Sequence, residues 1–363
     1  MPGKIQRIAI NTGGGDAPGL NAVIRSAVLS ALSRGWEVYG IRRGYGALLG
    51  EDEVIRMDAD TVRGITHLGG TILGTTNRGN PFEWPRRHVD GRVQPVDRSD
   101  QILDAFQSRG LDALIAIGGD GSLRIAQRLC EKGMPIVGVP KTIDNDLVGT
   151  TTFGFHTAVQ TATEALDKLH STAESHERVF VVEVMGRSTG WIALQSGLAA
   201  TADVILIPEI PFDLEKVCEK VRQRYAAGRR FAIVVAAEGA APRGGTASYI
   251  APATVGTAAR YGGFAERLAG QIAECTGYET RSLVLGHLQR GGTPTAYDRY
   301  LGSRFGTAAV ELIAAGKFGN MVAVNNDLIT GIPLDEAVER IKNVDPASHA
   351  VLTAKATGIS FGD

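Results

Sequence analysis

The sequence has few cysteines and no long hydrophobic run. Cys130, Cys218 and Cys275 are far apart, odd in number and outside any Cys-x-x-Cys motif. We therefore expect buried free thiols, in keeping with a reducing cytoplasm. No apolar segment is long enough to cross a bilayer, and residues 1–7 lead into a strand-like segment without the apolar core of a signal peptide. Neither a membrane anchor nor secretion is expected.

The sequence also lacks an excess of charge of either sign. Its formal net charge is -1, so no global positive field attracts nucleic acid or an anionic membrane. An anionic ligand must then be held by a local group of residues, which favours a small-molecule site. At 363 residues, with 44% hydrophobic and 21% charged side chains, the chain is globular in composition but long for one core. We expect two lobes with an active-site cleft between them.

Short runs rich in Ile and Val alternate with amphipathic segments, a pattern typical of Rossmann-like, three-layer α/β lobes with mostly parallel sheets. In the first unit the pattern predicts a strand at 8–10 and a glycine-rich loop at 13–19. The apolar stripe over 20–32 predicts a helix that ends before Gly35.

Polar loops follow two further predicted strands. Ser99 is expected to cap a helix that precedes the strand 113–117, which leads into Gly118-Gly119-Asp120-Gly121-Ser122. The strand 136–139 leads into the loop 141–146. Ligands of open α/β sheets bind beyond the carboxyl ends of the strands, so we expect these loops and the first glycine-rich loop to build the active site.

The second half of the chain predicts another α/β lobe. Its strands are expected at 180–184, 204–207, 231–237 and 282–285, with helices near 214–227 and 264–276. The segment 239–263, rich in Gly, Ala and Thr and without a clear period, is predicted to be a long surface loop.

Two of the loops carry residues suited to phosphate chemistry. Glycines at 13, 14, 15 and 19 let the backbone approach a phosphate at a helix N-terminus, although such a turn is often only tight packing. Asp120 offers the hard oxygen ligand that Mg²⁺ accepts and phosphoryl transfer needs, although it could also be a turn residue.

The loop 141–146 carries Asp144 and Asp146 directly after an apolar strand. One carboxylate can accept a hydroxyl proton while the other positions metal or substrate; the alternative is an Asp-rich turn. In the second lobe, arginine forks suit phosphate and a carboxylate suits sugar hydroxyls. Each such residue alone could be a surface charge, but together they indicate a sugar-phosphate pocket: Arg178, Arg187, Glu238, Arg281, His287 and Arg290.

These motifs, in this order, resemble the 6-phosphofructokinase family over most of the chain. The matching stretches are 14–21, 118–122, 142–146, 184–187, 237–239, 279–281 and 286–292. The resemblance implies Mg²⁺-dependent transfer of the ATP γ-phosphoryl group to the 1-hydroxyl of fructose 6-phosphate. It also implies a homotetramer or homodimer whose sites are shared between subunits.

By this resemblance Asp144 would be the base, Thr142 and Asp146 would hold the reacting groups, and Arg187 would stabilise the transferring phosphoryl group. Asp120 would serve Mg²⁺. The donor side would be lined by Gly15, Tyr45, Arg78, Gly119, Gly121, Ser122 and Lys141. The sugar phosphate would be bound by Met185, Gly186, Glu238, His287 and Arg290, with Arg178 and Arg281 from a neighbouring subunit.

The implied donor lobe comprises 1–155 plus about 289–338, and the fructose 6-phosphate lobe comprises 156–288 plus about 339–363.

The motifs give mixed signals about the phosphoryl donor. Gly121 is the residue of ATP-dependent members, whereas Lys141 occurs in pyrophosphate-dependent ones, and Asn77 stands where ATP enzymes often have an arginine. We expect ATP as the donor, because glycine leaves room for a nucleotide; pyrophosphate is the alternative. The basic residues of the family's allosteric site are only partly matched, so regulation through that site is not expected.

Three other classes fit less well. An NAD or lipid kinase would share 118–122 but gives no reason for 142–146. A dinucleotide-dependent oxidoreductase needs a Gly-x-Gly-x-x-Gly loop, which residues 13–19 lack. A non-catalytic sugar-phosphate-binding paralogue would usually have lost a base or metal ligand, and here Asp120, Asp144 and Asp146 are all present.

Overall fold

The structure, a computed structural model, describes residues 5–88, 90–251 and 260–363. The described residues form two compact units. Unit 1 contains those of Met1–His156 and Arg290–Ile341, and unit 2 those of Thr157–Ala253, Ala259–Gln289 and Lys342–Asp363. The roles of a donor lobe and a sugar-phosphate lobe remain predictions.

Unit 1 is built on a seven-stranded sheet in the order β15-β14-β7-β6-β1-β2-β3. The five inner strands are parallel, and the edge strands β3 and β15 are antiparallel. The strand bounds are β1 Arg7–Thr12, β2 Glu37–Ile41, β3 Val54–Met57, β6 Ala113–Gly118, β7 Ile136–Pro140, β14 Asn320–Asn325 and β15 Leu328–Pro333. β6 and β7 are buried throughout, which explains their continuous apolar sequences.

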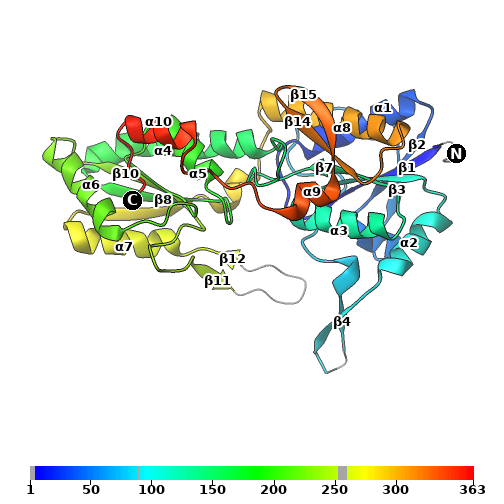
Figure 1. Cartoon of the computed structure of the whole chain (residues 1–363), viewed down its shortest axis with the longest axis horizontal. Helices are drawn as coiled ribbons and strands as arrows, with labels where there is room; N and C mark the ends of the chain where they lie inside the picture. The colour runs from blue at the N-terminus through cyan, green and yellow to red at the C-terminus, as the bar shows by residue number, and fades with distance from the viewer. Residues whose placement is uncertain (1–4, 89, 252–259) are drawn as a thin grey trace. The chain divides into compact units, whose positions relative to one another are not determined.

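Helices cover both faces of this sheet, as the three-layer prediction requires (Figure 1). α1 (Leu20–Ser33) and α8 (Ala296–Ala314) pack on one face, where Gly306 allows close approach because a side chain there would overlap the carbonyl group of Val23. The helices on the other face are α2 (Ser99–Ser108), α3 (Asp120–Glu131) and α9 (Leu334–Glu339), together with the 3₁₀ turn η1 (Gly44–Leu49).

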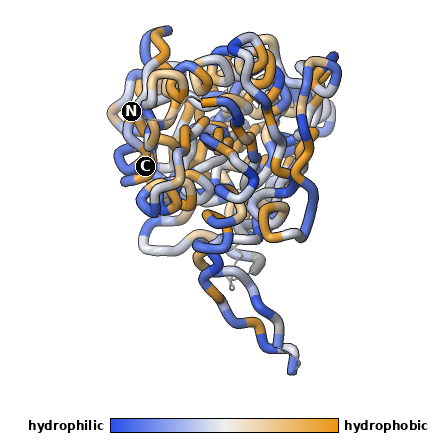
Figure 2. The backbone as a smooth tube through the Cα atoms, turned by 90° about the vertical axis from the view of Figure 1, so that its right-hand side faces the viewer, coloured by the Kyte–Doolittle hydropathy of each residue, from blue (hydrophilic) through white to orange (hydrophobic). Residues whose placement is uncertain are grey.

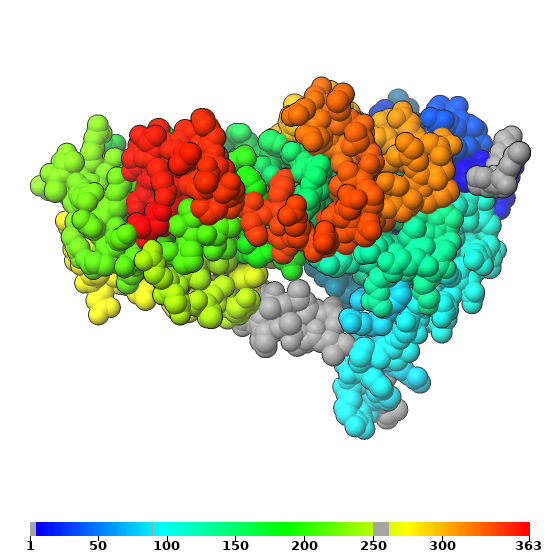
Figure 3. Space-filling view, viewed as in Figure 1, coloured from blue at the N-terminus to red at the C-terminus, as the bar shows by residue number. Residues whose placement is uncertain are grey.

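A hairpin of two short strands, β4 (Trp84–Arg87) and β5 (Val93–Val96), extends away from the sheet of unit 1 (Figures 1 and 2). Its strands pair only with each other, and Pro85 lies opposite Pro95. In the space-filling view it is the cyan projection (Figure 3). The sequence analysis did not predict this hairpin.

Unit 2 contains a four-stranded, fully parallel sheet in the order β13-β8-β10-β9. Its strands are β8 Val179–Val184, β9 Val204–Leu206, β10 Ala232–Ala237 and β13 Thr280–Val284. α6 (Leu214–Ala226) and α7 (Phe264–Thr276) cover one face. The other face carries α4 (Phe155–His176), α5 (Trp191–Ala199) and α10 (His349–Ala356) (Figure 1). The predicted mixed α/β fold with mostly parallel sheets is thus confirmed.

Two local predictions were wrong. Ser99 is the first residue of α2 and not its N-cap, because its hydroxyl group donates to the Asp97 carboxylate at 2.6 Å instead of accepting from the helix. The predicted loop 239–263 contains an antiparallel pair, β11 (Tyr249–Ala251) and β12 (Arg260–Tyr261); residues 252–259 lie outside the described part.

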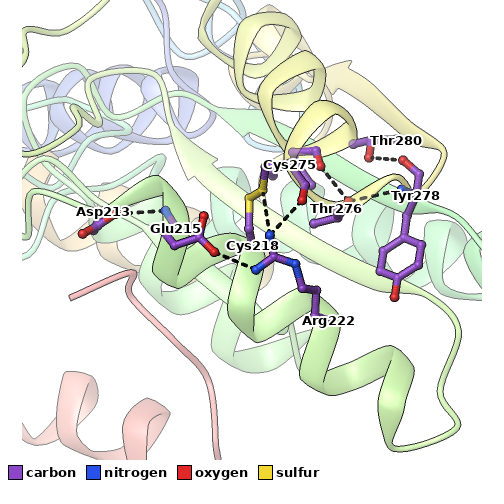
Figure 4. The surroundings of a disulfide bond; sticks show 9 residues. Asp213, Glu215, Cys218, Arg222, Cys275, Thr276, Tyr278 and Thr280 are labelled. Atoms are coloured by element: carbon purple, nitrogen blue, oxygen red, sulfur yellow. Dashed lines mark hydrogen bonds and ion pairs between the residues drawn. A yellow bond between two sulfur atoms is a disulfide. The ribbon is translucent and has the colours of Figure 1, made fainter.

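The prediction of three free thiols was also wrong. Cys218 on α6 and Cys275 on α7 form a disulfide with their Cα atoms 6.5 Å apart, and Cys130 is free and half-buried (Figure 4). The guanidinium group of Arg222 donates a 2.8 Å hydrogen bond to the Cys275 carbonyl oxygen. The two cysteines are 57 residues apart in sequence, so only the packing of α6 beside α7 brings them together.

None of the helices in the described residues is both long enough and apolar enough to span a membrane.

Candidate active site

Three loops of unit 1 begin at the carboxyl ends of β1, β6 and β7, which are neighbours in the sheet. They therefore lie at one edge, as predicted. The loops are tied together through their backbones: the Gly13 amide donates to the Ile117 carbonyl at 2.9 Å, and the Lys141 amide donates to the Gly118 carbonyl at 2.9 Å.

The glycines of the first loop leave room for functional side chains. A Cβ atom at Gly13 would lie 2.7 Å from the Ser122 hydroxyl oxygen, and one at Gly15 would lie 2.8 Å from Nη1 of Arg290. That same Nη1 donates a 3.0 Å hydrogen bond to the Asp16 carbonyl oxygen. Because Gly13 and Gly15 have no side chains, the Ser122 hydroxyl group and the Arg290 guanidinium group can lie against the glycine-rich loop.

Lys141 is a buried cation at the centre of this edge. Its ammonium group donates to the Gly15 carbonyl oxygen. Burial, and then the charge of Arg290, lower the pKa of Lys141 to about 8, while Asp144, Asp16 and Asp146 act in the opposite direction. The side chain therefore stands among three carboxylates and one guanidinium group.

Asp144 and Asp146 are both buried, at 3% and 7% exposure. The Asp144 amide donates to the Thr142 hydroxyl oxygen at 3.0 Å, and that hydroxyl group lies 3.4 Å from Oδ2 of Asp144. The Thr152 hydroxyl group donates to the Thr142 carbonyl at 2.7 Å, which fixes the loop from behind. This arrangement fixes the loop around Asp144, as a general base requires.

Asp120 is the first residue of α3 and follows Gly119, the N-cap. Its carboxylate is 26% exposed and accepts a 3.0 Å hydrogen bond from Nε of Arg124. No cluster of three or more metal-ligating side chains occurs in 5–88, 90–251 and 260–363. A single accessible carboxylate fits Mg²⁺, which usually binds one or two carboxylates together with waters and substrate phosphates.

The remaining predicted donor-side residues differ in exposure. A Cβ atom at Gly121 would meet nothing within 4 Å, so this position faces open space. Arg78 is exposed, in the segment whose Thr76 carbonyl accepts the Gly14 amide. Tyr45 is buried in the hydrophobic core of unit 1, and burial raises its pKa to about 12. Little of the Tyr45 ring is therefore accessible to a ligand.

In unit 2, predicted sugar-phosphate residues follow the carboxyl ends of β8, β10 and β13. Glu238 follows β10 directly, and its Oε1 accepts a 2.9 Å hydrogen bond from the amide of Arg187, a residue in the left-handed region with φ of 52°. Met185 and Gly186 follow β8, and His287 is exposed on the 3₁₀ turn Gly286–Gln289 after β13. The structure thus brings Met185, Gly186, Arg187 and Glu238 to one edge.

Two residues that the sequence analysis missed support this edge. Gln289 is fully buried; it accepts a 3.3 Å hydrogen bond from the Met185 amide and donates one to the Gly286 carbonyl. Glu209 accepts from the amides of Gly190 and Val344 at 3.0 and 2.9 Å, which fixes the start of α5. Gln289 lies inside a recognised motif, whereas no sequence pattern indicated Glu209.

Arg178 and Arg281 lie at the other edge of the same sheet. Arg178 directly precedes β8, and Arg281 is the second residue of the parallel neighbour β13, where Thr280 lies opposite Val179. Since six residues of strand span about 20 Å, these arginines are separated from Met185 by roughly the length of β8. They cannot contact a small ligand held by Met185 of the same chain.

Comparisons with known proteins agree with the motif order. The family model described as Phosphofructokinase matches residues 7–313. A curated "ATP-dependent 6-phosphofructokinase" from Chloroflexus aggregans is 52% identical over 100% of this chain and 99% of its own length. A "Pyrophosphate--fructose 6-phosphate 1-phosphotransferase" from Streptomyces coelicolor is 48% identical over 98% of this chain and 100% of its own length. The crystal structure of Pichia pastoris phosphofructokinase in the T-state has a TM-score of 0.79 and 32% identity, covering 98% of this chain and 37% of that one.

Proposed function

Because the chain belongs to the phosphofructokinase family, we infer that it is an ATP-dependent 6-phosphofructokinase, which phosphorylates fructose 6-phosphate in glycolysis. This conclusion rests on relatives named for that reaction, which match the whole chain with about 50% of residues identical. The reaction is a phosphotransfer to an alcohol. Catalysis of such a transfer depends mainly on positioning and on stabilising charge.

We propose Asp144 as the base that accepts the proton of the 1-hydroxyl group. Its support is burial in a loop whose orientation is fixed by Thr142 and Thr152. Thr142 and Asp146 would hold the reacting groups beside it. The charges of Asp144 and Asp146 act on the Lys141 ammonium group, so a buried cation stands beside the proposed base.

The donor's phosphates would be held by the glycine loop of unit 1 and by Lys141. Gly15, Gly119 and Ser122 contribute backbone amides or a hydroxyl group, and Arg78 an exposed cation. Asp120 would hold Mg²⁺, which neutralises charge on the phosphates when bound. Arg187 would stabilise the transferring phosphoryl group, and the orientation of its backbone is set by Glu238.

The sugar phosphate would be bound by Met185, Gly186, Glu238, His287 and Arg290, and by Arg178 and Arg281 of a neighbouring subunit. The position of the last two at the opposite edge of the sheet in unit 2 supports their action in trans. A homodimer or homotetramer with shared sites follows from this proposal. We propose a cytoplasmic enzyme that binds neither nucleic acid nor membrane.

The open space at Gly121 favours ATP over pyrophosphate, since a nucleotide needs room beyond its β-phosphate. Pyrophosphate remains the second candidate because Lys141 can hold a terminal phosphate of either donor. The test is a donor panel of ATP, ADP and pyrophosphate at saturating fructose 6-phosphate. A higher kcat/KM with pyrophosphate than with ATP would contradict the assignment.

A further inference from the structure

The carboxylate of Glu279 joins the two arginines at the amino edge of the sheet in unit 2. Its Oε1 accepts a 2.9 Å hydrogen bond from Nη2 of Arg178 and also pairs with Nη2 of Arg281. One carboxylate oxygen therefore holds two guanidinium groups on neighbouring strands. Both contacts lie within unit 2.

The backbone register explains this arrangement. Glu279 precedes β13 and Arg178 precedes β8, and the Val179 amide donates a 2.9 Å hydrogen bond to the Glu279 carbonyl oxygen. The segment before Glu279 is held in place because the Tyr278 ring stacks on Tyr225, with centroids 3.7 Å apart and an interplanar angle of 7°. Figure 4 shows Tyr278 beyond Cys275 and Thr276, where its amide donates to the Thr276 hydroxyl oxygen.

Charge explains why a carboxylate is needed there. Two guanidinium groups side by side repel each other, and each side chain has several rotatable bonds, so without an anion they would separate. The hydrogen bond from Arg178 and the charges of both arginines lower the pKa of Glu279, which keeps it ionised. Two cations and one anion leave a net positive charge for a phosphate.

Donor groups remain for that phosphate. Of the two side chains, Arg178 is 28% exposed and Arg281 is 56% exposed, so both are accessible at this edge. A guanidinium group held through Nη2 can still present other N–H groups to an anion.

We propose that Glu279 is a positioning residue that holds Arg178 and Arg281 in the orientation required to bind the phosphate of the sugar substrate in the neighbouring subunit. This inference rests on the proposed function. Glu279 itself does not touch the substrate; it acts through the two arginines. The alternative is a purely structural ion pair at the edge of the sheet, which would not affect substrate binding selectively.

The first test separates KM from kcat in Glu279→Ala and Glu279→Gln. We expect Glu279→Ala to raise KM for fructose 6-phosphate about three- to tenfold, with kcat and KM for ATP changed less than about twofold. Glu279→Gln keeps an oxygen acceptor and should show a smaller increase. Glu215→Ala is the matched control, because Glu215 forms an exposed ion pair with Arg222 in the same unit. An unchanged or lower KM in Glu279→Ala, with an unchanged melting temperature, would overturn the proposal.

The second test asks in which subunit Glu279 acts. Hybrids of Glu279→Ala and Asp144→Asn subunits should contain some sites with an intact base from one subunit and an intact Glu279 from the other. These sites should restore the wild-type KM for fructose 6-phosphate. Hybrids that keep the raised KM would overturn action in trans. A wild-type enzyme that does not phosphorylate fructose 6-phosphate would instead refute the proposed function, so the two failures are distinguishable.

Discussion

The ammonium group of Lys141 donates a hydrogen bond to the carbonyl oxygen of Gly15, from a side chain that is only 3% exposed. Its pKa of about 8 lies below the ordinary value of 10.5, mainly because of burial. The free enzyme therefore loses this cation as the pH rises through about 8. Because the cation is proposed to hold the donor's phosphates, we expect kcat/KM for ATP to fall above that pH.

The measurement is kcat/KM for ATP between pH 7 and 10 in the wild type and in Lys141→Met. The variant should have a lower value throughout and should lack the decline near pH 8. Lys141→Gly should also lower kcat/KM for ATP, but it should not abolish the ATP reaction. A wild-type profile that is flat across this range would exclude Lys141 from donor binding.

Asp144→Asn should lower kcat by about 10²–10⁴-fold, because the amide cannot accept the hydroxyl proton and general-base catalysis contributes about that much. The KM for fructose 6-phosphate and the melting temperature should change little, since Asn is nearly isosteric with Asp. Steady-state kinetics of the purified variant measure kcat and KM, and thermal unfolding measures the melting temperature. More than about a tenth of the wild-type kcat would remove Asp144 from this role.

Arg178→Ala and Arg281→Ala should each raise KM for fructose 6-phosphate by roughly ten- to a hundredfold and leave KM for ATP almost unchanged. A lost charge-assisted contact to phosphate costs about 1.5–3 kcal/mol. Hybrid oligomers of Arg178→Ala and Asp144→Ala subunits should regain activity, since some sites then receive both intact residues. If verified hybrids regain none, the site is built within one subunit.

Gly121→Asp should depress ATP use far more than pyrophosphate use. The carboxylate would enter the open space at this position and repel the extra phosphate of a nucleotide. The ratio of kcat/KM for the two donors, measured in parallel in the wild type and the variant, gives the effect. Gly270→Asp on α7 is a suitable control, because position 270 also has open space around it and α7 carries none of the proposed site residues. An equal loss with both donors would contradict the steric argument.

Cys218→Ser should destabilise the protein by about 2–4 kcal/mol, because the disulfide closes a long loop in the unfolded chain. Urea unfolding without reductant measures the change, and Cys130→Ser, which removes the free thiol, is the control. Thiol titration of the denatured protein purified without reductant should find one thiol per chain. Three thiols would show that the bond does not form in the cell, where reductants act against it.

The sequence predicted the edge of the sheet in unit 1 well because local signals agree there. Residues 113–117 and 136–139 are continuous apolar runs, which buried parallel strands require, and polar loops follow them at 118–122 and 141–146. In an α/β chain, a short apolar run between two helical segments can hardly be anything other than a buried strand. The positions of Asp120 and Asp144 followed from those strand ends.

What the sequence could not predict depends on contacts between distant segments. Glu279 contacts Arg178, about a hundred residues away, only because β13 pairs with β8 in one register. Cys218 meets Cys275 only because α6 and α7 cover the same face. Tyr45 lies in a glycine-rich segment and was predicted to line the donor site. The packing of η1 against the core buries it instead.

The hairpin of unit 1 has a consequence for solubility. A two-stranded ribbon exposes the hydrogen-bonding groups of both its edges, and another chain could add a strand there and start aggregation. Pro85 and Pro95, opposite each other on β4 and β5, each lack an N–H group, so neither edge offers a continuous row of donors. The exposed charge of Arg86 beside them also opposes close approach of a second ribbon. The hairpin can therefore extend into solvent without becoming a template for fibril growth.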